Sequence, residues 1–246
     1  MSGFFVSFAN ETNSIEPMIH FQRKPEVTAD GSLTFYIPEI DEHYHSTNGA
    51  VVEAQHVYLK EALLHYIAHS NADSVRILEV GFGTGLNAFL TLLKADELKI
   101  PVYFTTLELY PLTIGQIDLL NYPDQIAPER KDSYRALHLA EWECQVPVTP
   151  YFTLEKRHCN LVTDQLEGVF DVVYFDAFAP DKQPEIWSEE IYRKIAGAMH
   201  ESGVFTTYCA KGVVRRGFRD AGFQMERIPG PPGKREMIRG TLTSAK

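Results

Sequence analysis

Three glycines stand close together where a short β-branched segment ends. Residues 75–80 lead directly into Gly81, Gly83 and Gly85, and Leu86-Asn87 then opens an apolar segment. Glycines allow a tight turn and a close approach of the backbone to a ligand, and the first turn of a helix offers unpaired N–H groups. The spacing Gly-x-Gly-x-Gly differs from the Gly-x-Gly-x-x-Gly of dinucleotide sites. We therefore predict a small-molecule site at a strand-to-helix turn, and a turn that binds no ligand is the weaker alternative.

Carboxylates follow two further strand-like segments. Asp176 comes directly after residues 170–175, and Glu108 follows residues 102–107. Because the carboxyl ends of parallel strands border the ligand crevice of an open sheet, we expect both side chains to face that crevice. Asp176 could orient an amine and accept its proton, or it could merely cap the next turn. Glu108 stands where an acceptor for two ribose hydroxyls belongs, a position that NAD proteins also fill with an acidic residue.

Aromatic residues and a proline accompany the Asp176 segment. Phe178 and Pro180 follow it closely and could exclude water and hold a flat base, and Trp187 could line the entrance for a substrate. The alternative for all three is packing within the core.

The C-terminal part of the chain is basic although the whole chain is acidic. A formal net charge of −10 and a pI near 5.4 exclude a protein whose entire surface coats nucleic acid. From Lys211 to Arg239, eight basic residues face three acidic ones, so this segment carries +5 and the remainder −15. The asymmetry predicts one anionic partner on one face, with Arg215-Arg216 and Lys234-Arg235 on phosphates. A solvated helix face is the alternative.

Composition limits the remaining classes of function. The chain has 246 residues, 44% of them hydrophobic, which suffices for one sizeable core. Cys144, Cys159 and Cys209 form no Cys-x-x-Cys pair, and the histidines have no converging third ligand, so neither disulfides nor a metal site are expected. No apolar run approaches the roughly 20 residues that span a bilayer, and residues 1–6 do not resemble a signal peptide. We expect a cytoplasmic protein with no membrane partner.

The order of the elements predicts an α/β fold. Strand-like runs alternate with helical patterns along residues 75–222, which indicates a Rossmann-like, doubly wound sheet. We expect seven mostly parallel strands, the last of which, near residues 235–242, runs antiparallel. Residues 51–69 read as a helix, and residues 111–150 as a polar, less regular middle. Residues 1–70 should pack as a small β/α extension on a cofactor-binding domain of residues 71–246.

Several ordered motifs resemble those of one enzyme family. They are Glu79-Val-Gly-Phe-Gly-Thr-Gly-Leu-Asn87, Glu108-Leu-Tyr-Pro-Leu112, Asp176-Ala-Phe-Ala-Pro180 with Pro184-Glu-Ile-Trp187, Val214-Arg-Arg216, Ala221-Gly-Phe223 and Gly233-Lys-Arg-Glu-Met237. The first motif resembles the cofactor loop of class I S-adenosyl-L-methionine-dependent methyltransferases. The whole set, over most of residues 75–240, resembles the methyltransferase domain of MnmC.

The resemblance implies a reaction and a set of functional residues. That family methylates the 5-aminomethyl group of 5-aminomethyl-2-thiouridine at the wobble position of tRNA, with S-adenosyl-L-methionine as the cofactor. It implies Asp176 as the catalytic carboxylate. The cofactor contacts would come from Glu79, Gly81, Gly83, Gly85, Asn87, Glu108, His158 and Cys159.

The chain departs from the family pattern at three points. His158 replaces an acidic residue that usually faces the adenine, and Cys209-Ala stands where the family tends to have Ser-Ala. Many members continue into a flavin-dependent oxidoreductase domain, which is not found before Lys246, so we expect a separate oxidoreductase to act upstream. Two other functions stay open. One is a small-molecule amine methyl- or aminopropyl-transferase of the polyamine-synthase type, which would not need the basic tract. The other is a non-catalytic cofactor- or RNA-binding module.

Overall fold

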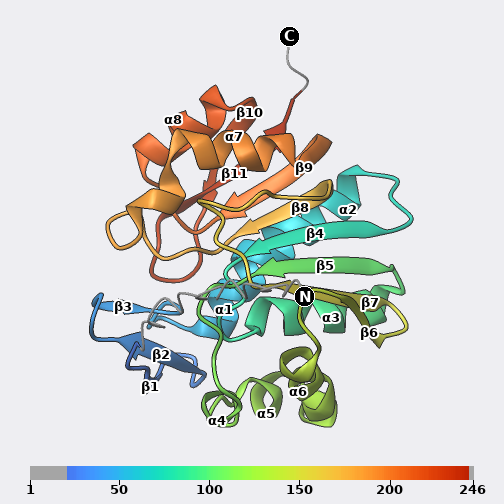
Figure 1. Ribbon diagram of the computed structural model, residues 1–246, viewed down its shortest axis with the longest axis vertical. Coiled ribbons are helices and arrows are strands. Elements are labelled where there is room, and N and C mark those ends of the chain that lie inside the picture. The colour runs from blue at the N-terminus through green and yellow to red at the C-terminus, as the bar shows by residue number, and fades with distance from the viewer. Residues whose placement is uncertain (1–20, 244–246) are drawn as a thin grey trace, which may run out of the picture.

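An eight-stranded sheet forms the centre of the computed structural model, which describes residues 21–243 (Figure 1). Its strand order is β10-β11-β9-β8-β4-β5-β7-β6. The strands are β4 (Val75–Val80), β5 (Val102–Leu107), β6 (Gln145–Thr149), β7 (Phe152–Arg157), β8 (Phe170–Phe175), β9 (Met199–Thr207), β10 (Phe223–Pro229) and β11 (Glu236–Leu242). The inner strands β9, β8, β4, β5 and β7 are parallel, whereas β11 joins β9 antiparallel. The predicted α/β sheet and its antiparallel last strand are confirmed.

The expected number of seven strands was too low. The eighth strand is β6, which pairs antiparallel with β7 at the edge of the sheet and shifts its register between Pro147 and Thr149. It lies within the stretch interpreted as irregular, which also holds the short helices α4 (Ile114–Ile117), α5 (Tyr122–Ile126), η2 (Pro128–Arg130) and α6 (Lys131–Leu139). An edge strand with a proline and no fully buried side chain gives only a weak alternating pattern, which explains the error.

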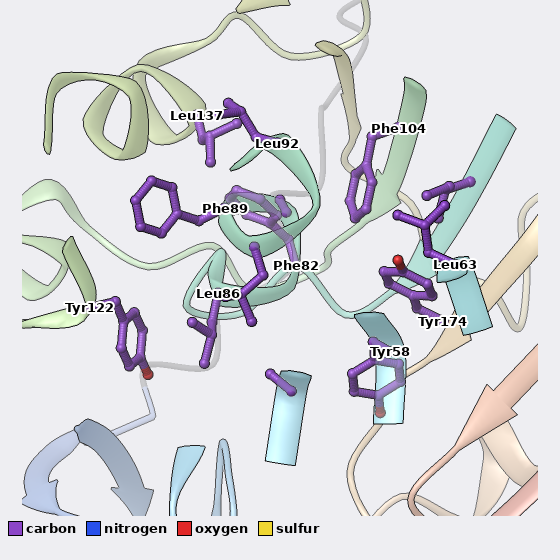
Figure 2. Packing of buried hydrophobic residues seen from close by; sticks show 14 of the residues in the cluster. Tyr58, Leu63, Phe82, Leu86, Phe89, Leu92, Phe104, Tyr122, Leu137 and Tyr174 are labelled. Carbon is purple, nitrogen blue, oxygen red and sulfur yellow. The ribbon is translucent and has the colours of Figure 1, made fainter. Parts of the chain in front are cut away.

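Helices cover both faces of the sheet. On one face, α3 (Leu86–Leu98) packs with Phe104 and Tyr174, and Figure 2 shows this cluster. On the other face, α7 (Glu189–Gly197) and α8 (Gly212–Asp220) pack with Val173 and Phe175, preceded by the short helix η3 (Pro184–Trp187). Because successive strand residues point to opposite faces, Tyr174 and Phe175 belong to different clusters. Both faces of β8 are therefore buried, so its side chains cannot form a site on either face of the sheet.

The segment before β4 packs into the same core. It contains a small antiparallel sheet of β1 (Lys24–Val27), β2 (Leu33–Ile37) and β3 (Glu42–His43). A continuous helix follows, made of α1 (Ala50–Ala54), the π-helical η1 (Gln55–Leu64) and α2 (His65–His69). Phe35, Val57 and Tyr58 are buried members of the cluster around α3.

The helix expected over residues 51–69 is present, but the π-helical turns were not foreseen. Buried pairs occur at 53/54, 57/58 and 62/63, so the repeat lengthens from four residues to five. This wider winding keeps Tyr58 and Leu63 on the buried side.

No helix within residues 21–243 is long and apolar enough to cross a membrane. The predicted absence of a signal peptide concerns residues 1–6, which lie outside the described residues.

Candidate active site

A cavity of about 440 Å³ lies at the carboxyl ends of four neighbouring parallel strands. Its wall includes Gly81 after β4, Glu108 after β5, Asn160 after β7 and Asp176 after β8. This volume lies in the range of small-molecule and cofactor sites. The strand ends thus bring together the loop and both carboxylates that the sequence singled out.

The glycine loop passes close to the end of β8. Gly81 has φ +92°, and a Cβ atom there would lie 2.9 Å from the carbonyl oxygen of Asp176. Gly83 has φ +49° and lines the cavity, where a Cβ atom would lie 3.0 Å from the ring of Tyr44. The two glycines therefore keep the backbone in a left-handed conformation and leave room beside it.

Gly85 serves the helix rather than the cavity wall. It has φ +70° and is the N-cap of α3, and a Cβ atom there would lie 2.7 Å from Nε2 of His138. It is not among the residues that line the cavity, whereas Asn87 in the first turn of α3 is. The third glycine thus permits close packing on α6.

Two hydrogen bonds hold the carboxylate of Asp176. Tyr58 Oη donates to Oδ1 over 2.6 Å, and Asn87 Nδ2 donates to Oδ2 over 2.8 Å. Burial raises the pKa of Asp176 to about 7, although both hydrogen bonds act in the opposite direction. A carboxylate with such a pKa at a cavity wall is suited to accept a proton near neutral pH.

Glu108 connects the glycine loop to the loop after β5. The N–H of Gly83 donates to Oε2 over 2.9 Å, and the N–H of Tyr110 donates to Oε1 over 2.7 Å. Both bonds fix the carboxylate at the cavity wall. A fixed carboxylate with remaining lone pairs can accept the hydrogen bonds of a ribose diol.

Glu79 lies beneath the glycine loop, outside the residues that line the cavity. It is fully buried, and its Oε2 accepts a 2.7 Å hydrogen bond from Thr106 Oγ1. Burial raises the pKa of Glu79 well above its usual value. Glu79 therefore lies behind the cavity wall, where its carboxyl group is held by Thr106.

His158 and Cys159 have different surroundings. Cys159 lines the cavity together with Asn160, whereas His158 does not. The Nε2–H of His158 donates to the carbonyl oxygen of Leu109 over 3.0 Å, and its backbone N–H donates to Glu143 over 2.6 Å. The imidazole is thus engaged by the loop after β5 instead of lining the cavity.

The loop after Asp176 contributes one aromatic ring to the cavity. Phe178 lines it and packs edge-on against Tyr44, with ring centroids 5.4 Å apart. Trp187 is buried, and its Nε1–H donates to the carbonyl oxygen of Phe178 over 2.7 Å. Pro180 is half-buried in the same loop, and neither it nor Trp187 lines the cavity. Trp187, expected at a substrate entrance, instead supports the loop from within the core.

Ion pairs engage most of the basic tract from Lys211 to Arg239. The pairs are Lys211 with Asp181, Arg219 with Asp220, Arg227 with Glu236, Lys234 with Glu53, and Arg239 with Glu61 and Glu226. Within residues 21–243, no ion pair to a carboxylate is found for Arg215, Arg216 or Arg235. Lys234, expected on a phosphate, is half-buried and pairs with the buried carboxylate of Glu53.

Sequence reasoning missed the residues that reach the site from before β4. Tyr58 and Tyr44 contact Asp176 and Phe178, and Phe21 also lines the cavity. Tyr58 falls in a segment read only for its apolar period, and nothing in the sequence connects it to a residue 118 positions later.

Within the described residues, no group of three or more His, Cys, Asp or Glu side chains is arranged to hold a metal ion.

Comparison with known proteins agrees with this geometry. Residues 151–243 match the model of a family described as S-adenosyl-L-methionine-dependent methyltransferases. This part of the chain belongs to that methyltransferase family. Its cofactor is accordingly S-adenosyl-L-methionine, and the residues fit it. At Gly81 and Gly83 the missing side chains leave space for the cofactor beside the backbone. The carboxylate of Glu108 is placed to accept the hydrogen bonds of its ribose diol.

The resemblance to MnmC is confirmed by individual relatives of this methyltransferase. The tRNA 5-methylaminomethyl-2-thiouridine biosynthesis bifunctional protein MnmC of Cupriavidus metallidurans is 32% identical over 227 residues, which are 87% of this chain and 33% of that protein. The protein of the same name from Vibrio cholerae serotype O1 is 34% identical over 227 residues, 83% of this chain and 33% of that protein. The chain spans about a third of the length of these curated relatives.

Two solved structures share the methyltransferase fold. MnmC2 from Aquifex aeolicus superposes with a TM-score of 0.72 at 22% identity and covers 92% of this chain and 72% of its own. Spermidine synthase from Thermotoga maritima superposes with a TM-score of 0.51 at 14% identity and covers 90% and 72%.

Proposed function

We propose that this methyltransferase acts on the primary amine of 5-aminomethyl-2-thiouridine at the wobble position of tRNA and forms 5-methylaminomethyl-2-thiouridine. The observation that carries the proposal is the carboxylate of Asp176, held by Tyr58 and Asn87 at the wall of the cofactor cavity. The similarity to the MnmC proteins supports this choice of acceptor.

Asp176 can guide the amine through the transfer. The cofactor supplies an electrophilic methyl group on a sulfonium. An alkyl amine has a reference pKa of about 10.4 and attacks only through its neutral form. The nitrogen lone pair forms the new N–C bond while the S–C bond breaks, and the amine gives up one proton. Asp176 orients the nitrogen by accepting its hydrogen bonds and receives that proton.

Phe178 and Tyr44 can hold the uracil ring beside Asp176. Their rings meet edge to face at the cavity wall, with centroids 5.4 Å apart, and offer apolar surface to a planar base. A base that is splayed out of a single-stranded loop can reach such a pocket, which suits an anticodon position.

Phosphate contacts are assigned to the arginines outside the ion pairs. Arg216 is exposed and Arg215 is half-buried, both on α8, and Arg235 is exposed in the turn between β10 and β11. Guanidinium groups match phosphate oxygens and remain charged at every physiological pH. These three residues form the proposed RNA-binding surface.

Mass spectrometry of tRNA nucleosides tests the proposed function. The purified chain and S-adenosyl-L-methionine are incubated with tRNA that carries 5-aminomethyl-2-thiouridine, and the gain of one methyl group is expected at that nucleoside. Free diamines and polyamines serve as competing acceptors. Methylation or aminopropylation of these amines, with tRNA unchanged, would assign the chain to the polyamine-synthase type.

A further inference from the structure

Lys234 is half-buried in an exposed turn, and its ammonium reaches a buried carboxylate. Its Nζ lies 2.6 Å from Oε1 of Glu53 and 4.1 Å from the centroid of the Tyr208 ring. Glu53 is only 7% exposed, and the N–H of Ser46 donates to its other oxygen over 2.8 Å. Because Glu53 is buried, removal of Lys234 would leave an uncompensated buried carboxylate, so this pair differs from one between two exposed side chains.

Both partners of Lys234 are linked to the segment around Asp176, one by a hydrogen bond and one through a shared helix. Tyr208 Oη donates to the carbonyl oxygen of Ala177, the residue after Asp176, over 2.9 Å. Glu53 precedes Tyr58 in the same continuous helix, and Tyr58 donates to Asp176. The ammonium of Lys234 thus connects the β10–β11 turn to two elements that position the catalytic carboxylate.

Charges on several elements act on Asp176. Tyr58 from η1 and Asn87 from α3 lower its pKa by hydrogen bonding, Glu53 from α1 raises it, and Lys234 lowers it. Tyr208, directly after β9, and Glu79 from β4 also face Asp176. Glu53 and Lys234 oppose each other, so loss of the lysine alone would leave the repulsion of Glu53.

We propose that Lys234 is a positioning residue for methyl transfer and not a phosphate contact. Held by Glu53 and Tyr208, its ammonium fixes the backbone that follows Asp176 and neutralises the buried charge of Glu53 beside it. This inference rests on the proposed function, because its main readout is tRNA methylation.

Kinetics of Lys234→Met test the inference. We expect kcat to fall about 10-fold or more because the carboxylate and its loop lose their support, while KM for tRNA stays within about twofold. The rising limb of the pH profile should move to higher pH, since a positive charge near Asp176 is lost. Lys234→Arg keeps the charge and should recover part of kcat.

Lys94→Met is the matched control. Lys94 pairs with Glu97 at 2.5 Å, and its side chain is 23% exposed against 31% for Lys234. Glu97 is exposed on α3, so this pair carries no buried charge, and kcat and KM should stay at their wild-type values.

Two further measurements keep the inference open to refutation. If Lys234→Met does not fold, the Glu53→Gln/Lys234→Met double variant leaves no unpaired charge and should fold with reduced kcat. Full kcat in the double variant, or raised KM with unchanged kcat in Lys234→Met, would overturn the proposal. Wild-type protein that binds S-adenosylhomocysteine but does not methylate the tRNA would instead refute the proposed function.

Discussion

Tyr58 donates a 2.6 Å hydrogen bond to Asp176 across 118 residues of sequence. Burial raises the pKa of Tyr58 well above its usual value, so the hydroxyl keeps its proton and remains a donor throughout the working pH range. The bond stabilises the charged form of Asp176 against the burial that disfavours it. A tyrosine from the π-helical segment η1 thereby influences the protonation state of Asp176 at the end of β8.

Tyr58→Phe should slow methyl transfer without changing the fold. The variant removes one donor to Asp176, so the pKa of that carboxyl should rise from its value of about 7, and less of the base is available at neutral pH. We expect kcat to fall about 10-fold, consistent with one lost hydrogen bond to a charged group. Tyr66→Phe is the control, because Tyr66 on α2 donates to Asp171 at the other end of β8 over 3.1 Å. Equal loss in both variants would show a general effect on the helix.

The dependence of kcat/KM on pH should follow Asp176 in the free enzyme. With a pKa of about 7, the carboxyl is protonated and inactive as a base below that pH and charged above it. Activity should therefore rise through pH 7 and continue to rise as more of the amine becomes neutral. The Asp176→Asn variant should lack the inflection near pH 7. Stopped assays with tRNA between pH 5.5 and about 9 measure both profiles.

Cofactor binding should depend on Gly83 and Glu108. Gly83→Val brings a branched side chain to φ +49°, where its Cβ atom meets Tyr44, so S-adenosyl-L-methionine should no longer bind. Gly115→Val is the control, since no atom outside its chain neighbours and the backbone of its own helix lies within 4 Å of a Cβ there. Glu108→Ala should weaken binding by about 1.5–3 kcal/mol. Calorimetry measures each affinity, and unchanged affinity in folded Gly83→Val would contradict the placement.

The strand pattern of the sequence predicted the centre of the sheet well, for a physical reason. Residues 75–80, 102–107 and 170–175 are short apolar runs because parallel strands are buried on both faces, and the structure has β4, β5 and β8 at these positions. Glycines and carboxylates directly after such runs fall at one edge of the sheet. Gly81, Glu108 and Asp176 could therefore be assigned to one cavity from their positions alone.

Residues brought in by tertiary packing could not be predicted. Tyr58 reaches Asp176, and Tyr44 reaches the cavity wall, through the placement of the N-terminal elements, which carries no local signal. Lys234 was assigned to phosphate because a charge count cannot tell a paired cation from a free one. Its partner Glu53 lies 181 positions earlier in the chain.

Charge reversal of Arg215 and Arg216 should weaken tRNA binding and leave cofactor binding unchanged. Both lie on α8 outside the cavity wall, and neither forms an ion pair with a carboxylate in residues 21–243. Each lost phosphate contact should reduce the slope of log K against log salt by about 0.7–0.9. Arg135→Glu on α6 is the exposed control. Fluorescence anisotropy over a salt series measures the slope, and a salt-independent complex would favour a small-molecule acceptor.

Asp176→Asn should lower turnover and raise stability at alkaline pH, because burial of the charged Asp176 carboxylate lowers the free energy of unfolding. The folded-state pKa of about 7 lies above the value of 3.8 for an unperturbed aspartate. The contribution of Asp176 to the free energy of unfolding is therefore fully present below about pH 4, where the carboxyl is protonated in both states. It is lost as pH rises towards 7. An asparagine has no charge to bury, so its loss of turnover should come with a gain in stability at alkaline pH.

We expect turnover of Asp176→Asn to fall by roughly 10²–10⁴ with normal binding of S-adenosyl-L-methionine and tRNA. At pH 8 its melting temperature should exceed that of the wild type, by about 2–4 °C for each kcal/mol. At pH 4 the difference should disappear, because the wild-type carboxyl is then protonated. Calorimetric scans at both pH values and single-turnover methylation measure the two effects. A lower melting temperature at both pH values would make Asp176 a structural turn residue, and near-wild-type turnover would place the catalytic proton acceptor elsewhere.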